Sequence, residues 1–136
     1  MASITAIEGI GPKYRTKLAA ADIRTCEKLV AVGATRKGRK QLADTCGLSE
    51  KRILEWVNRA DLMRINGVST QYSDLLEAAG VDTVKELKRR KAANLHEAMA
   101  ATNARRKNPL VRQVPALSQV ERWIASAKEL PAVVKH

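Results

Sequence analysis

The sequence predicts an all-α fold, and three observations lead to this prediction. Alanine and leucine dominate the apolar residues, β-branched residues rarely cluster, and no stretch alternates apolar and polar positions as a half-buried strand would. Proline, glycine and capping residues stand at intervals that suit helix starts and stops. The chain of 136 residues also repeats itself, so we expect tandem helical units packed as one compact helical domain.

Eight helices with short connections are expected, near residues 12–21, 25–32, 36–46, 49–60, 70–79, 83–91, 93–102 and 117–128. Pro12 suits the first position of a helix, where the N–H that proline lacks would have no partner. Thr83 with Glu86, and Ser118 with Glu121, have the spacing of a capping box that opens a helix.

Helix ends are indicated by glycine. Gly33, Gly47 and Gly80 stand where helices should stop. Asp22 occupies the position of Gly80 in the first copy of the repeat. If this turn needs a positive φ, Asp22 is expected to be strained, because an L side chain disfavours that region.

The repeat appears when the chain is aligned with itself at a shift of 58 residues. Residues 7–30 then match residues 65–88, and eight of the 24 pairs are identical. Trp56 matches Trp123 only with an insertion of 9 residues, for which the basic stretch 103–115 is the candidate. We therefore expect a first unit at 4–62, a second, degenerate unit at 63–130 with a basic insertion around 103–115, and a tail at 131–136.

Charge and aromatic content narrow the class of partner. The chain has 25 lysines and arginines against 14 acidic residues, a net charge of +11, which favours a polyanion such as nucleic acid or an acidic membrane face. Aromatic residues make up 3% of the chain, which disfavours surfaces that stack single-stranded bases, so DNA is expected over RNA. The four rings form two repeat-related pairs, Tyr14 with Tyr72 and Trp56 with Trp123, and are interpreted as packing residues; base platforms are the alternative.

The segment from Ile7 to Pro12 (Ile-Glu-Gly-Ile-Gly-Pro), which runs into an amphipathic helix, resembles the turn of the helix-hairpin-helix superfamily. Its central isoleucine would anchor the turn inward, and N–H groups at the following helix start would receive a phosphate oxygen, helped by the helix dipole. Such a contact reads the backbone and not the bases. The alternative is that the glycines only permit tight helix packing. The predicted nucleic-acid-binding residues here are Gly9, Ile10, Gly11, Lys13, Arg15 and Lys17, with Lys13 nearest the turn.

The second copy departs from this pattern. Ser69 stands where Gly11 stands in the first copy, and a serine there would cap the helix and occupy N–H groups that a phosphate would use. Asp74 and Glu77 replace the basic run. We interpret the second turn as mainly structural.

The arrangement of the whole chain resembles an uncharacterised bacterial branch of this superfamily, a domain of unknown function with two degenerate helix-hairpin-helix repeats. The resemblance rests on the first turn, the junction 56–62, the second turn at Gly67, and the segment 114–118 leading to Trp123. It implies the fold and no assigned activity.

Three further basic clusters are predicted to contact nucleic acid, and for each the alternative is a solvated surface. The clusters are Arg36, Lys37, Arg39 and Lys40; Lys88, Arg89, Arg90 and Lys91; and Arg105, Arg106 and Lys107, with Arg112 nearby. The first two do not align under the repeat shift, so shared packing does not explain them.

Other classes of function are disfavoured. The sequence has no phosphate-binding loop of the Gly-Lys-Ser/Thr type, nucleophile elbow or zinc-protease motif, so no enzyme activity and no cofactor are expected. Two unpatterned cysteines, Cys26 and Cys46, and a lone His96 do not form a metal site and suit a reducing compartment. Without a signal-peptide pattern or a run long enough to cross a bilayer, a cytoplasmic location and no membrane partner are expected.

The leading functional prediction is therefore a non-enzymatic protein that binds the backbone of nucleic acid, duplex DNA in preference to RNA, without reading sequence. The runner-up is a protein-interaction or self-assembly module, motivated by the acidic second turn and the apolar tail segment 130–134. A third prediction is a lysine-dependent lyase acting on abasic DNA, for which no particular lysine stands out.

Overall fold

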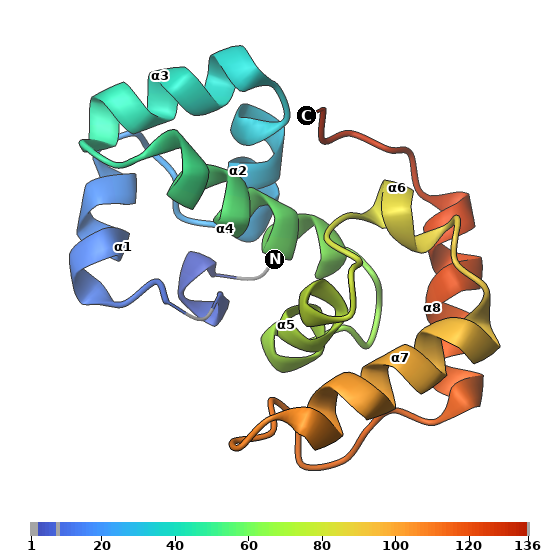
Figure 1. The fold of residues 1–136 in the computed structure, drawn as a ribbon. Coiled ribbons are helices and arrows are strands. Elements are labelled where there is room, and N and C mark those ends of the chain that lie inside the picture. The colour runs from blue at the N-terminus through green and yellow to red at the C-terminus, as the bar shows by residue number, and fades with distance from the viewer. Residues whose placement is uncertain (1–2, 8, 136) are drawn as a thin grey trace. The chain divides into compact units, whose positions relative to one another are not determined.

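The helix order follows the predicted one, with one short element added. The computed structural model describes residues 3–7 and 9–135. A 3-10 helix, η1 (Ile4–Ala6), precedes eight α-helices in this part of the chain (Figure 1): α1 (Pro12–Ala19), α2 (Cys26–Gly33), α3 (Arg36–Cys46), α4 (Glu50–Leu62), α5 (Thr70–Ala78), α6 (Val84–Leu87), α7 (Ala92–Arg105) and α8 (Leu117–Glu129). Among the described residues the only extended pairing is one isolated bridge between Ser3 and Thr25. The all-α prediction is confirmed.

Helix starts follow the capping residues. The hydroxyls of Thr25, Thr35 and Thr83 each accept a hydrogen bond from the backbone N–H three residues on, at 3.1, 3.1 and 3.3 Å. The capping box predicted at Ser118 is wrong, because α8 starts earlier. Ala116 is its N-cap residue, and the Gln119 side chain accepts from the Ala116 N–H at 3.3 Å.

Helix α6 is shorter than predicted. Its last turn tightens into bonds three residues apart, from the Arg89 N–H to the Glu86 carbonyl and from the Arg90 N–H to the Leu87 carbonyl. Bonds of this kind are typical of a helix end, so the α-helix stops at Leu87.

Three of the residues predicted to stand after helices have left-handed backbone conformations. Gly47 and Gly80 have φ of +67° and +99°, and Asp22 has φ of +62°. The predicted strain at Asp22 is therefore present. Gly33, the last residue of α2, is glycine because of packing: a Cβ there would lie 2.5 Å from Cγ2 of Val57.

The chain divides into two compact units between Asp61 and Leu62, against an expected boundary between residues 62 and 63. The first unit contains the residues up to Asp61 together with those from Val133 on, and the second runs from Leu62 to Ala132. Val134 is buried, and the Lys135 N–H donates to the Ala34 carbonyl at 2.7 Å. The end of the expected tail is thus part of the first unit.

The two units have equivalent hydrogen bonds at matching positions, as well as the same helix order. The Ile10 N–H donates to the Ile7 carbonyl at 3.2 Å, and the Val68 N–H donates to the Ile65 carbonyl at 3.1 Å. After the next helix, Ile23 bonds to Leu18 in the first unit as Val81 bonds to Leu76 in the second. The sequence repeat is therefore a structural repeat.

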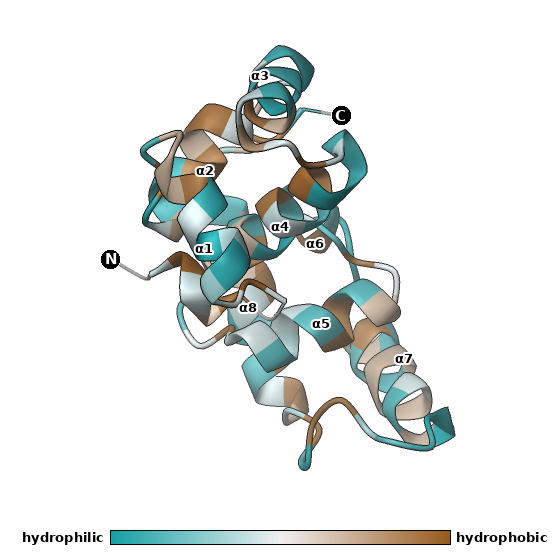
Figure 2. Ribbon diagram, turned by 90° about the vertical axis from the view of Figure 1, so that its left-hand side faces the viewer, coloured by the Kyte–Doolittle hydropathy of each residue, from teal (hydrophilic) through white to brown (hydrophobic). Residues whose placement is uncertain are grey.

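Apolar residues fill each unit. In the second unit α7 packs on α5 and α8, and α6 packs on α8. Its core comprises Leu62, Ile65, Val68, Leu75, Leu76, Val81, Val84, Leu87, Leu95, Met99, Val111, Val120, Trp123, Ile124 and Ala127. In the first unit α2 packs on α3, and Figure 2 shows α3 hydrophilic over most of its length beside a more hydrophobic α2.

Candidate functional site

The first turn places two glycines at the surface over a buried isoleucine. Ile10 is 4% exposed and anchors the turn inward, as predicted. Gly9 has φ of +95°, so the turn requires glycine at this position. Glu8 lies outside the described residues.

Gly11 is not required by the fold. It is the N-cap of α1 with φ of −89°, which any residue adopts, and no atom lies within 4 Å of the place where its Cβ would stand. Among the described residues no side chain caps α1, whose first residue is Pro12. Because Gly11 is exposed, the start of this helix is open to a ligand from outside.

The three cations of α1 lie on two sides of the helix. Lys13 and Lys17 are four residues apart and therefore share a side, whereas Arg15 lies on the other side of the stripe formed by Tyr14 and the buried Leu18. Lys13 and Arg15 are exposed, and Lys17 is half-buried. Lys13 stands in the first turn of α1, next to the glycines.

Arg52 joins this site, although it belongs to none of the basic clusters of the sequence. Its guanidinium carbon lies 5.0 Å from the centroid of the Tyr14 ring, and Nη1 donates to the Tyr14 hydroxyl at 2.5 Å. Tyr14 stands in the first turn of α1, so Arg52 adds a cation beside the open helix start. Arg52 lies one helical turn before Trp56, and the fold, not the repeat, packs Trp56 on Tyr14, so no local pattern indicates this contact.

The second turn is closed where the first is open. Gly67 has φ of +91°, close to the φ of its equivalent Gly9, so this turn also requires glycine. The Ser69 hydroxyl accepts a hydrogen bond from the Tyr72 N–H at 3.3 Å, so the predicted serine cap is confirmed. This bond occupies one of the N–H groups that a ligand of α5 would need.

The four aromatic rings are packing residues, as predicted, and in each unit the tyrosine contacts the tryptophan of the same unit. Tyr14 and Trp56 meet edge to face with centroids 5.2 Å apart, and Tyr72 and Trp123 have the same separation. Trp56 and Trp123 are 3% and 2% exposed. Packing is therefore their role in the structure, and neither indole face is open to a base.

A family model described as Domain of unknown function (DUF4332) matches residues 8–130. The chain belongs to this family. The match includes both turns and extends through α8, so the repeat lies within this DUF4332 domain. No curated protein and no solved structure matches the chain.

The basic cluster of α3 in this DUF4332 domain consists of three exposed side chains and one buried side chain. Arg36, Lys37 and Lys40 are exposed. Arg39 is 4% exposed and donates to the carbonyls of Gly33 and Lys135, so its guanidinium is committed inside the first unit. Figure 1 shows α3 along the edge of this unit opposite the turn that precedes α1, so the structure does not bring the cluster to the turn.

Two members of the cluster after α6 hold the second unit together. The Lys88 ammonium donates to the Leu130 carbonyl at the end of α8, at 2.8 Å. Arg90 bonds to the Glu86 carboxylate and to the Gly80 carbonyl. Arg89 and Lys91 are exposed.

The basic insertion is fixed by one buried asparagine. The Asn103 side chain donates to the Val111 carbonyl at 3.0 Å and accepts from the N–H groups of Leu110 and Val111. The three consecutive cations of this stretch, Arg105, Arg106 and Lys107, are exposed.

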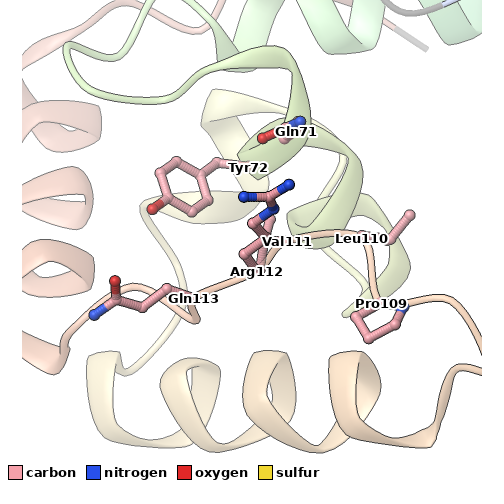
Figure 3. Close-up of a pocket in the computed structure, with 7 residues that line it drawn as sticks. All are labelled: Gln71, Tyr72, Pro109, Leu110, Val111, Arg112 and Gln113. Atoms are coloured by element: carbon pink, nitrogen blue, oxygen red, sulfur yellow. The ribbon is translucent and has the colours of Figure 1, made fainter.

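The same insertion lines a pocket beside the second turn. Residues 109–113 form one wall, and Gln71 and Tyr72 at the start of α5 form the other (Figure 3). The Arg112 side chain points from the loop toward α5 in this view. The start of α5 thus has a loop against it in addition to its serine cap.

The thiols are shielded. Cys26 donates to the Ser3 carbonyl at 3.4 Å, and burial, with the charge of Glu27, raises the pKa of the Cys26 thiol to about 11. Burial also raises the pKa of Cys46. The described residues contain no group of three His, Cys, Asp or Glu side chains that could hold a metal ion.

Within residues 3–7 and 9–135, no helix has both the length and the apolar character that a bilayer span requires.

Proposed function

We propose that this DUF4332 domain binds the phosphate backbone of nucleic acid, duplex DNA in preference to RNA, through its first turn and without reading sequence. In this proposal both turns are helix-hairpin-helix turns, and only the first is active. No chemical step is involved.

Gly11 is the observation that carries the proposal. Neither its backbone conformation nor packing calls for glycine, and serine at the equivalent position of the second unit caps its helix. A glycine at an N-cap leaves the first N–H groups of the helix open, at the positive end of the helix dipole. A phosphate oxygen is the ligand that such a helix start receives best.

The surrounding charge supports an anionic ligand. Lys13 and Arg52 approach the start of α1, one from the helix itself and one through Tyr14. Helix α1 has no acidic residue in its first turn. Cations at a helix start are each unfavourable by about 0.3–1 kcal/mol, so stability does not account for them.

The apolar tail, which motivated the assembly alternative, is used within the chain. Val134 is buried in the first unit, and the Leu130 carbonyl is bonded to Lys88. Leu117, at 39%, is the exposed large apolar residue of the described chain. These contacts weaken one of the observations that favoured an assembly module; the acidic second turn remains in its favour.

A titration of a short labelled duplex, followed by fluorescence anisotropy, tests the proposal. About three phosphate contacts at the turn predict that log K falls with log salt at a slope near −3. Lys13→Ala should weaken binding for all sequences and reduce the slope by about 1. The matched control is Lys40→Ala, which removes an equal charge from the opposite edge of the first unit and should leave the slope unchanged. No binding at about 50 mM salt would refute the proposal.

A further inference from the structure

Each turn glycine lies directly over the polar atom of a buried tryptophan. A Cβ on Gly9 would stand 3.8 Å from Nε1 of Trp56, and a Cβ on Gly67 would stand 3.3 Å from Nε1 of Trp123. Apart from the chain neighbours of each glycine, no other atom lies within 4 Å of these positions. Each turn therefore has a small recess, left by the missing side chain, with an indole N–H at its base.

The two indole rings are held firmly. Trp56 is 3% exposed and packs edge to face on Tyr14 at 5.2 Å, which Arg52 covers in turn. Within the described part of the chain, no acceptor is found for either indole N–H, and neither Nε1 is among the fully buried atoms that lack a partner. Each N–H is therefore within reach of water or of a ligand, which are the usual partners of such a donor. The fold maintains this donor in both units.

We infer that the indole N–H of Trp56 donates a hydrogen bond to the anion bound at the first turn, where a phosphate oxygen enters the recess beside Gly9. This inference rests on the proposed function and adds a specific atom to it. Trp56 would supply the only side-chain donor that comes from inside the fold, alongside backbone N–H groups at the start of α1 and the charge of Lys13. A rigid donor loses little freedom on binding, which favours a fixed position for the phosphate.

The second unit provides the matched control. Trp123 occupies the same position, but Ser69 takes up a backbone N–H of α5 and no cation stands where Lys13 stands, since Gln71 is its equivalent. The same indole geometry thus occurs once with an open helix start and once with a closed one. Only the Trp56 N–H should respond to a ligand.

The two indole N–H groups can be observed separately by NMR. The intact, 15N-labelled protein gives one indole 1H–15N signal for each tryptophan, and Trp123→Phe assigns them. On titration with a short DNA duplex at low salt, the Trp56 signal should move downfield and its hydrogen exchange should slow, while the Trp123 signal stays in place. If anisotropy reports binding but the Trp56 signal does not move, or both signals move equally, the inference is wrong and the proposed function stands. If the wild-type protein does not bind the duplex, both are wrong.

Substitution gives a second measurement. Trp56→Phe keeps a ring against Tyr14 and removes the N–H, and should weaken duplex binding about tenfold, as expected for a hydrogen bond to a charged acceptor. Trp123→Phe makes the same change in the second unit and should leave the affinity unchanged. Because Trp56→Phe can also disturb the core, its circular dichroism spectrum and urea midpoint are compared with those of Trp123→Phe. Equal affinity of a folded Trp56→Phe and the wild type would contradict the inference.

Discussion

Arg39 donates a hydrogen bond from Nη2 to the backbone carbonyl of Lys135, 96 residues further along the chain, at 2.7 Å. Nη1 of the same side chain donates to the Gly33 carbonyl at 2.8 Å, and the Lys135 N–H donates to the Ala34 carbonyl. One buried cation thus joins the end of α2 to the returning C-terminal residues. A residue that the sequence places in a surface cluster is part of the interior of the first unit.

Replacing Arg39 should therefore cost stability and leave nucleic-acid binding unchanged. Arg39→Ala leaves two carbonyls without their charged donor, and we expect a loss of about 2–3 kcal/mol in the free energy of unfolding. The exposed neighbour Lys40 is the matched control, since Lys40→Ala should change stability by less than about 0.5 kcal/mol. Urea unfolding measures both variants. Equal stability of the two would show that the carbonyl contacts do not matter.

Gly9→Ala tests the left-handed conformation of the first turn. With φ of +95°, an alanine there is strained, and we expect a loss of about 1–3 kcal/mol in the free energy of unfolding. Thermal or urea unfolding gives the value. Gly67→Ala should behave in the same way in the second unit, where the added methyl also crowds the indole of Trp123. A neutral Gly9→Ala would mean that the turn relaxes to another conformation.

Gly11→Ser should change stability and binding in opposite directions. The serine side chain has room and can cap α1, as Ser69 caps α5, so the free energy of unfolding should rise by about 0.2–0.5 kcal/mol. The same hydroxyl would occupy an N–H group that the proposed phosphate needs, so duplex affinity should fall. Ser69→Gly is the reverse substitution, and it should lower stability by a similar amount. Anisotropy and urea unfolding on the two variants, compared with the wild type, decide the matter; a parallel change in both quantities for Gly11→Ser would contradict the explanation.

Asp22→Gly should stabilise the protein. Asp22 has φ of +62°, and the equivalent residue of the second unit is already Gly80. Its ion pair with Arg24 is exposed and contributes little. Relief of the left-handed strain should raise the free energy of unfolding by about 0.5–1 kcal/mol, measured by urea titration. Arg24→Ala serves as the control for the loss of the ion pair, and it should be nearly neutral.

The buried thiol of Cys26 predicts a pH dependence. Its pKa in the folded state is raised to about 11 from an ordinary value of 9.0, so the folded state holds the proton more tightly. The stability that this provides is complete below pH 9.0 and is lost as the pH rises toward about 11, because the unfolded thiol ionises first. The stability difference between the wild type and Cys26→Ala should therefore narrow over this range. Urea midpoints of both proteins across the range measure it, and a constant difference would show that Cys26 titrates normally.

Much of the fold follows from local patterns, since helix starts and stops depend on residues close in sequence. Thr25 and Thr83 cap helices as their spacing predicts, and Gly80 turns the chain where it should. The errors have local causes too: α8 begins before Ser118, with the Gln119 side chain accepting from the Ala116 N–H, and α6 ends early in tight turns. The candidate site was less predictable, because Arg52 reaches Tyr14 only through the packing of α4 on α1.

The sequence by itself determined the all-α class, the repeat, the repeat-equivalent positions of the four rings and the contrast between Gly11 and Ser69, because each depends on residue type and spacing along the chain. The tertiary structure decided which cationic side chains are available to a ligand. Arg39, Lys88 and Arg90 are used as donors to carbonyls, and Arg52 is brought to the first turn. A charge count cannot distinguish a cation that neutralises backbone carbonyls from one that faces solvent, since the difference arises from contacts between residues far apart in the chain.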